Sequence, residues 1–163
     1  MHKARNEKQI ADPDRLLVQV RQWGLFSKLY KTFLDFLIMG DRKKLLIVDD
    51  DLHVLKACTG AFYRYDARIA IGAEEAIGYL VGGYRPNFIL VDNDMRNRDD
   101  GVRFVNALYV GSLGAFSGDS RVALWSARMC RDIRNKVKEF PCVKCFTKPV
   151  SNIGEIATHF EDR

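Results

Sequence analysis

The sequence lacks long uncharged hydrophobic runs and is poor in cysteine and proline, with four of each among 163 residues. Its most apolar amino-terminal segment, residues 25–39, is interrupted by Lys28, Lys31 and Asp35, so it is too short and too charged to span a bilayer. No early apolar run ends in the small residues of a secretory cleavage site. Four cysteines are too few for a disulfide scaffold. We therefore expect a cytoplasmic protein with reduced thiols and no membrane span.

A general excess of positive charge is also missing from most of the chain. The formal net charge is +5, and residues 1–44 carry all of it, which leaves residues 45–163 neutral overall. A basic helix face is expected within residues 128–140, but Asp132 and Glu139 dilute it. The charge pattern therefore favours a solvated or protein-binding face, and we expect no nucleic-acid partner.

Composition divides the chain into two regions, with residues 1–43 as a basic and apolar helical extension and residues 44–163 as a separate domain. In the extension, Asp12-Pro13-Asp14 is typical of a helix start, and apolar residues recur at helical spacing up to residue 39. Such an apolar stripe needs a partner surface. Two roles remain open: packing on its own domain, or forming a docking or homodimer contact through residues 12–39.

Residues 44–163 alternate regularly between short apolar runs and amphipathic segments. Five such β–α units in strict alternation predict an α/β fold, an open parallel sheet with helices on both faces. The expected strands are residues 45–48, 67–73, 87–91, 122–125 and 143–147, and the expected helices are residues 52–62, 74–81, 102–109, 128–140 and 152–160.

Polar side chains follow four of the five expected strands. Asp49 and Asp50 follow the first strand, Asp92 the third, Ser126 the fourth and Lys148 the fifth. The carboxyl ends of parallel strands meet at one edge of a sheet, which is where ligands bind. We therefore expect these five side chains to lie together.

This combination of residue types indicates phosphoryl chemistry that depends on a metal. Clustered carboxylates repel one another, and Mg²⁺, which prefers oxygen ligands, relieves that repulsion. Asp49 and Asp50 are the candidate metal ligands, and Asp92 is the candidate nucleophile. Ser126 and Lys148 would stabilise the phosphoryl oxygens. An acid or hydroxyl at any one of these positions is ordinarily a helix cap. Five polar residues placed together at the ends of four strands, however, favour a functional site.

Four motifs carry a family resemblance: Leu-Leu-Ile-Val-Asp49-Asp50-Asp51, Phe-Ile-Leu-Val-Asp92, Leu-Trp-Ser126-Ala127 and Phe-Thr-Lys148-Pro149. They resemble the motifs of response-regulator receiver domains from two-component signalling, over about residues 44–163. The resemblance implies a flavodoxin-like, doubly wound, five-stranded parallel sheet of order 2-1-3-4-5. It also implies a bacterial phosphorelay protein that signals by protein contact.

The resemblance also implies a role for each site residue. Asp92 would accept the phosphoryl group from a histidine kinase or phosphotransfer protein. Mg²⁺ would be held by Asp49, Asp50 and Asp92, together with the backbone carbonyl of Asp94. Ser126 would be the switch hydroxyl that moves toward the phosphate, and Lys148 would pair with that phosphate.

The sequence departs from the receiver pattern at several positions. Met95-Arg96 replaces the usual Met-Pro, and the loop to Gly101 is one residue longer than usual. The switch position three residues before the lysine holds Cys145 instead of an aromatic, and neighbouring Phe146 should point to the opposite face of the sheet. We therefore expect phosphorylation without the usual aromatic relay.

Two positions tune dephosphorylation in this family, the second residue after the phosphoacceptor and the second after the switch residue. They are Asp94 and Arg128 in this sequence. Their opposite charges predict an ion pair across the mouth of the site that gates the access of water.

The favoured interpretation is a single-domain response regulator with no enzymatic activity beyond its own phosphorylation and dephosphorylation. The last expected helix ends near residue 161, so no output domain is expected and the output is a contact with a downstream protein. One alternative is a degenerate receiver that acts as a phosphorylation-independent interaction module. A weaker one is a haloacid-dehalogenase-like phosphatase, which needs a further acidic pair that residues 149–163 offer only as Glu155, Glu161 and Asp162.

Overall fold

The computed structural model describes residues 42–111, 120–148 and 153–162, and all of them belong to the unit that begins at Arg42. The expected amino-terminal helix and homodimer contact at residues 12–39 lie outside the described residues. The same holds for most of the Gly/Ser connection at residues 111–120 and for the start of the last expected helix.

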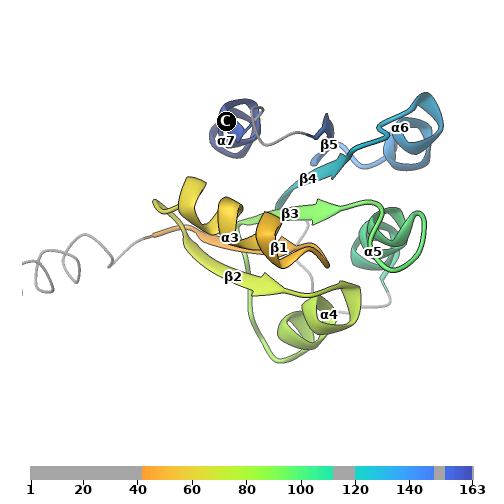
Figure 1. Ribbon diagram of the computed structural model, residues 1–163. Coiled ribbons are helices and arrows are strands. Elements are labelled where there is room, and N and C mark those ends of the chain that lie inside the picture. Colours follow the sequence, from red (N-terminus) through yellow and green to blue (C-terminus); the bar gives the residue numbers. More distant parts are fainter. Residues whose placement is uncertain (1–41, 112–119, 149–152, 163) are drawn as a thin grey trace, which may run out of the picture. The chain divides into compact units, whose positions relative to one another are not determined.

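Five parallel strands form a single sheet in the order β2-β1-β3-β4-β5 (Figure 1). This is the predicted order of a flavodoxin-like, doubly wound fold. Each strand pairs in parallel with its neighbours in the sheet. For example, Val48 of β1 lies opposite Val91 of β3, and Asp92 of β3 lies opposite Trp125 of β4. The strands are Lys44–Val48 (β1), Asp66–Ala70 (β2), Phe88–Asp92 (β3), Arg121–Ser126 (β4) and Val143–Thr147 (β5).

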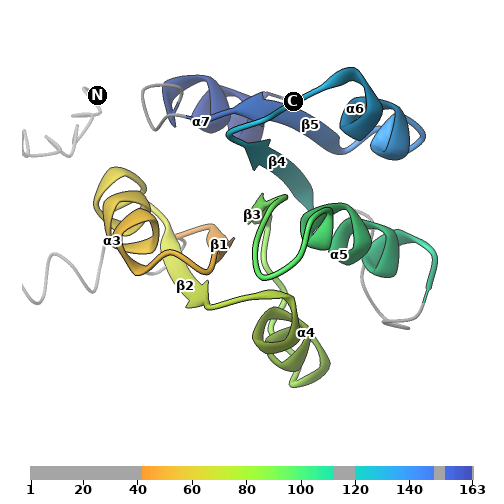
Figure 2. The same cartoon turned by 45° about the vertical axis from the view of Figure 1, so that its right-hand side comes forward.

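Five helices cover the two faces of the sheet. Helices α3 and α7 pack on one face, and α4, α5 and α6 pack on the other (Figures 1 and 2). A hydrophobic core lies on each face of the sheet, and successive strand residues point alternately into one core and the other. For example, Leu45 and Ile47 face α3, while Leu46 and Val48 face α4 and α5. The helices are Leu52–Ala61 (α3), Ala73–Val81 (α4), Asp100–Tyr109 (α5), Arg131–Val137 (α6) and Ile153–Glu161 (α7).

Two predicted elements were too long, and local hydrogen bonds explain both differences. Strand β2 ends at Ala70 instead of residue 73, because Gly72 adopts a φ of 142° and the Ile71 N–H donates to Glu75 Oε2 at the start of α4. The helix expected from residue 128 begins only at Arg131.

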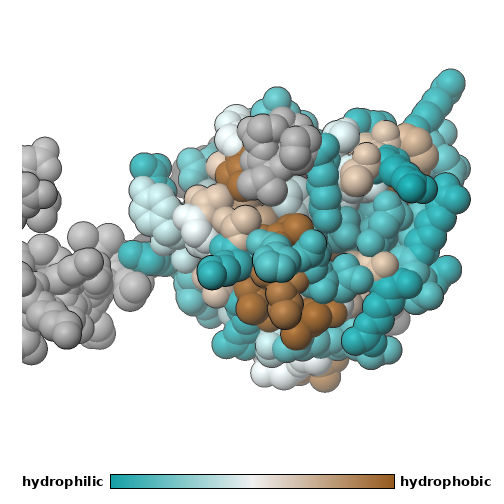
Figure 3. Space-filling view, in the orientation of Figure 1, coloured by the Kyte–Doolittle hydropathy of each residue, from teal (hydrophilic) through white to brown (hydrophobic). Residues whose placement is uncertain are grey.

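Strand β2 forms one edge of the sheet and is more exposed than the central strands. Ile69 within the strand and Ile71 just after it are 40% and 47% exposed. The space-filling view shows a hydrophobic area near the end of this strand (Figure 3). Among the residues that the structure describes, no helix combines the length and the apolar composition needed to cross a bilayer.

Candidate functional site

The predicted site residues lie together at the carboxyl end of the sheet because backbone pairing continues past the strand ends. Asp92 is the last residue of β3 and stands opposite Trp125. The Asp49 N–H donates to the Ala70 carbonyl (3.2 Å), and the Lys148 N–H donates to the Ser126 carbonyl (3.0 Å). The sheet therefore fixes the backbone from which each functional side chain projects.

Three carboxylates form an acidic cluster at this edge. One oxygen from each of Asp49, Asp50 and Asp92 lies within 4.8 Å of the others. Asp49 and Asp92 are buried, with exposed fractions of 0% and 4%, whereas Asp50 is exposed. The Asp51 N–H donates to Asp49 Oδ1 at 2.9 Å, which fixes the orientation of that carboxylate. The cluster therefore has a rigid buried side and one side open to solvent.

Lys148 bridges the two buried carboxylates. Its Nζ lies 3.0 Å from Asp49 Oδ2 and 3.2 Å from Asp92 Oδ1, and it stands 4.9 Å from the centre of the Trp125 ring. One ammonium thus serves two buried acids, and its position is restricted from three sides.

The electrostatics of the cluster raise the pKa of Asp92. Burial raises the pKa of Asp92 and the charge of Asp49 adds to this, while Lys148 acts in the opposite direction. Burial alone would lower the pKa of Lys148, but its hydrogen bond to Asp49 and the charges of Asp92 and Asp49 outweigh it, so the pKa is raised. Lys148 therefore favours its charged form and is shared between Asp49 and Asp92.

This donor set fits a hard divalent cation. Three carboxylates converge, and Lys148 pairs with two of them, so negative charge remains uncompensated. Every side-chain ligand in the cluster offers an oxygen. Mg²⁺ and Ca²⁺ both prefer such ligands. Asp49, Asp50 and Asp92 are therefore the residues that could hold the metal.

Ser126 reaches the site but points toward Asp94 and not toward Asp92. It is fully buried, its Oγ donates to Asp94 Oδ2 at 2.8 Å, and it accepts from the Arg128 N–H at 3.0 Å. This second bond holds residues 127–128 in a turn, which explains why α6 starts later than expected.

The expected ion pair between Asp94 and Arg128 is absent from the described part of the chain. Asp94 instead accepts from Ser126 Oγ and from Asn93 Nδ2, the latter at 2.9 Å. The Arg128 side chain lines a cavity of about 370 Å³ beside Asp94, together with Arg98 and Ile133. Nearby neutral donors therefore occupy both oxygens of this carboxylate.

The side chains of Cys145 and Phe146 lie on opposite faces of the sheet. Cys145 packs with the core beneath α5 and α6, and Phe146 packs with the core beneath α3 and α7. Burial raises the pKa of the Cys145 thiol, which disfavours its thiolate form, and the side chain packs against the core.

Sequence reasoning missed two residues that shape the site, Gly101 and Asn93. A Cβ built on Gly101 would lie 2.7 Å from Asn93 Cα and 2.9 Å from Asp92 C, so α5 packs directly on the backbone of the candidate nucleophile. Asn93 is fully buried beside it. An Asp-Gly pair was visible in the sequence, but only the tertiary packing shows why glycine is needed.

We expect Asp92→Asn to stabilise the domain at pH 7 in metal-free buffer, by on the order of 1 kcal/mol. Because burial raises the pKa of Asp92 in the folded state, its stabilising contribution is complete at low pH and is lost as pH rises through that pKa. Denaturant unfolding at pH 7 and at pH 4 measures this, with exposed Asp162→Asn as the control. The gain should shrink at pH 4, and a variant less stable than wild type at pH 7 would contradict this prediction.

Comparison with solved structures finds the same fold in response regulators. A response regulator receiver protein from Pseudomonas putida is 26% identical, with a TM-score of 0.57, and the match covers 74% of this chain and 96% of that one. A CheY-like receiver domain protein from Methanospirillum hungatei is 18% identical, with a TM-score of 0.58 and coverages of 74% and 95%. A Burkholderia pseudomallei response regulator, solved with a phosphorylated aspartic acid, calcium ion and citrate, is 18% identical, with a TM-score of 0.60 and coverages of 73% and 66%.

Searches by sequence find less than the comparison of structures. No protein-family model and no curated protein matches this chain. The likeness is therefore carried by the fold.

Proposed function

The described residues have the fold of a response-regulator receiver domain, and from that premise we propose that Asp92 accepts a phosphoryl group in a Mg²⁺-dependent reaction. The phosphoryl donor would be a histidine kinase or a phosphotransfer protein. The observation that carries the proposal is the contact of Lys148 Nζ with both Asp49 and Asp92 at the carboxyl edge of the sheet. This contact places a fixed cation beside the buried carboxylate of Asp92, which is the proposed nucleophile.

In the proposed reaction, an Asp92 carboxylate oxygen bonds to phosphorus while the bond from phosphorus to the donor atom breaks. The donor keeps that electron pair and takes up a proton from solvent. Lys148 moves from neutralising the carboxylate to neutralising the phosphoryl oxygens, a short step from its position 3.2 Å from Asp92 Oδ1. Ser126 turns from Asp94 to donate to the new phosphoryl group.

A bound Mg²⁺ would supply charge neutralisation at the phosphoryl oxygens. We propose Asp49, Asp50, Asp92 and the backbone carbonyl of Asp94 as the ligands in this chain. Mg²⁺ suits the proposal because its small octahedral shell leaves positions for water and phosphoryl oxygens.

Two observations bear on the alternatives. Of the further acids that a haloacid-dehalogenase-like phosphatase would require, Glu155 and Glu161 fall on α7 and Asp162 directly follows it. Glu161 accepts a hydrogen bond from the Tyr65 hydroxyl at 2.9 Å. The intact cluster around Lys148 favours a working phosphoacceptor over a degenerate interaction module. We further propose that the protein is bacterial and cytoplasmic and acts on a downstream protein by contact.

Intact-protein mass spectrometry tests the function. Wild type incubated with Mg²⁺ and a small acyl phosphate should gain the mass of one phosphoryl group, and the gain should vanish with EDTA or in Asp92→Ala. Asp66→Ala, which removes an exposed aspartate at the far end of β2, is the matched control. A wild type that binds Mg²⁺ but gains no mass would favour the interaction module.

We expect Asp94→Ala to change the phosphoryl lifetime more than Arg128→Ala. Asp94 is hydrogen-bonded to the switch hydroxyl, whereas Arg128 contacts it through its backbone N–H, which the substitution preserves. Both positions are proposed to tune dephosphorylation, and we expect about a tenfold change for Asp94→Ala and about threefold or less for Arg128→Ala. The decay of phosphorylated mass after donor removal measures this. A larger effect from Arg128→Ala would contradict this prediction and would support the gating ion pair of Asp94 with Arg128 that the sequence predicted.

A further inference from the structure

Asn93 follows the candidate phosphoacceptor directly and has no role in the reaction proposed above. It is fully buried, its backbone N–H donates to the Trp125 carbonyl (2.8 Å), and its carbonyl accepts from the Gly101 N–H (3.1 Å). These two bonds fix the backbone between β4 and α5, so the direction of the side chain is set as well.

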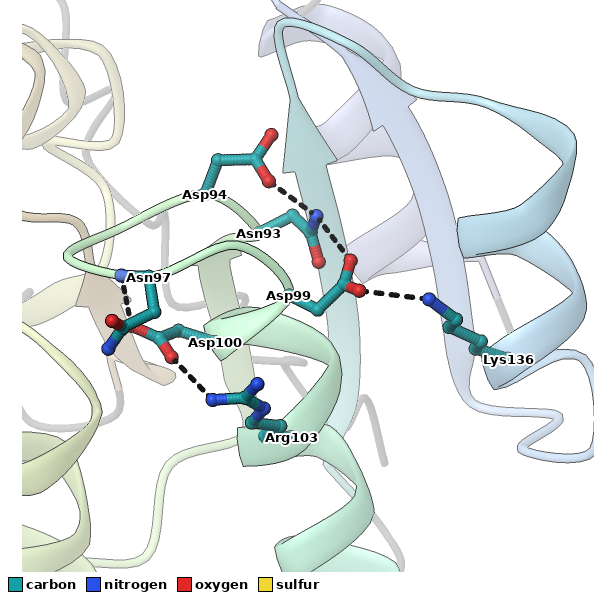
Figure 4. Close-up of polar contacts among 7 residues, drawn as sticks. All are labelled: Asn93, Asp94, Asn97, Asp99, Asp100, Arg103 and Lys136. Atoms are coloured by element: carbon teal, nitrogen blue, oxygen red, sulfur yellow. Dashed lines mark hydrogen bonds and ion pairs between the residues drawn. The ribbon is translucent and has the colours of Figure 1, made fainter.

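The Asn93 amide makes contacts on its nitrogen side alone. Nδ2 donates to Asp94 Oδ1 at 2.9 Å and to Asp99 Oδ1 at 3.4 Å (Figure 4). Within the described residues, Oδ1 is buried without a donor. Rotating the amide by half a turn would aim Oδ1 at two carboxylates, so these acids dictate its orientation.

A buried acceptor without a donor costs about 1–3 kcal/mol, and an apolar side chain at this position would avoid that cost. We infer that the two hydrogen bonds donated by Nδ2 offset the cost of the unpaired Oδ1. One of them holds the carboxylate that binds Ser126, and the other holds the loop residue that precedes α5.

Asp99 extends the contact from Asn93 to helix α6. Its Oδ2 lies 2.9 Å from Lys136 Nζ (Figure 4). Lys136 also pairs with Asp132 at 2.9 Å. A continuous series of polar contacts therefore joins Ser126 to α6. Its members, in order, are Ser126, Asp94, Asn93, Asp99, Lys136 and Asp132.

We propose that Asn93 is a positioning residue whose amide holds Asp94 as the resting partner of Ser126. The same amide anchors that arrangement to α6 through the ion pair of Asp99 with Lys136. Loosening the anchor lets Asp94 turn toward solvent, which frees the Ser126 hydroxyl to meet the phosphoryl group. This inference rests on the proposed phosphorylation of Asp92 and adds to it a control exerted from α6.

Lys136→Met tests the proposal most directly, because it breaks the anchor on α6 while Lys136 makes no contact with the acidic cluster among the described residues. Lys138→Met is its matched control, since Lys138 is an exposed lysine at the end of the same helix and forms no ion pair among the described residues. We expect Lys136→Met to speed phosphorylation by small acyl phosphates about three- to tenfold, with Lys138→Met unchanged. Asn93→Leu should give a similar gain, and the double variant should show no more than the larger single effect.

A second readout does not depend on phosphorylation. The Arg128 N–H donates to Ser126 Oγ, so its amide resonance reports the position of the switch hydroxyl in the resting protein. Lys136→Met should shift this resonance and Lys138→Met should not. If wild type is phosphorylated but the two lysine variants behave alike in both readouts, the inference is overturned. If wild type takes up no phosphoryl group, the proposed function fails. The Arg128 amide resonance alone then tests whether Lys136 on α6 influences the position of the Ser126 hydroxyl.

Discussion

Gly101→Ala is expected to lower the free energy of unfolding by about 3 kcal/mol. The new Cβ would lie 2.7 Å from Asn93 Cα, 2.9 Å from Asp92 C and still closer to Asp92 O, so the neighbours that must move are backbone atoms of β3 and its following loop. The Gly101 N–H also donates to the Asn93 carbonyl, and a displaced helix would weaken that bond. Denaturant unfolding measures the loss.

Gly78→Ala provides the matched control for this substitution. Gly78 is an exposed residue inside α4, and a Cβ there meets nothing within 4 Å. Alanine should therefore stabilise the domain by about 0.5–1 kcal/mol, through better helix propensity. If Gly101→Ala proved as stable as wild type, the close approach of α5 to the Asp92 backbone would be wrong.

Lys148→Met is expected to slow phosphorylation of Asp92 about 100-fold. The substitution keeps a long side chain but removes the ammonium that lies 3.0 Å from Asp49 and 3.2 Å from Asp92. The phosphoryl oxygens would then lack a fixed cation in a buried site. The rate of mass gain with a small acyl phosphate measures this loss.

The same variant should change the pH dependence of the reaction. Lys148 lowers the pKa of Asp92, so its removal raises that pKa, and less of the carboxylate is ionised at any given pH. The acid limb of the rate profile should therefore move to higher pH. Lys144→Met, which removes an exposed lysine of β5, should leave both rate and profile unchanged. An unshifted profile in Lys148→Met would contradict the proposed electrostatics of the site.

Much of the fold follows from short patterns in the sequence. Phe88 to Val91 is a continuous apolar run because β3 is central and buried on both faces, and Asp92 follows it at the carboxyl edge. The expected positions of Asp49, Ser126 and Lys148 followed from the same rule, since each comes directly at or after the end of a strand.

What the sequence did not reveal depends on which neighbours meet in space. The charges of Asp94 and Arg128 predicted an ion pair, but Ser126 and Asn93 supply donors to both oxygens of Asp94. Nothing in the sequence marks Asn93 as buried, because its immediate neighbours are Asp92 and Asp94. Those contacts arise only once the loop after β3 folds back over the end of β4.

The most direct test of the central claim is to locate the phosphoryl group within the chain. Borohydride reduces an aspartyl phosphate to homoserine, so wild type treated with an acyl phosphate and Mg²⁺, then reduced and digested, reports the modified residue by peptide mass spectrometry. The structure predicts homoserine at residue 92 alone, dependent on Mg²⁺ and absent in Lys148→Met under the same brief exposure. Modification at another aspartate, or at none in a protein shown to bind Mg²⁺, would contradict a phosphoacceptor at Asp92.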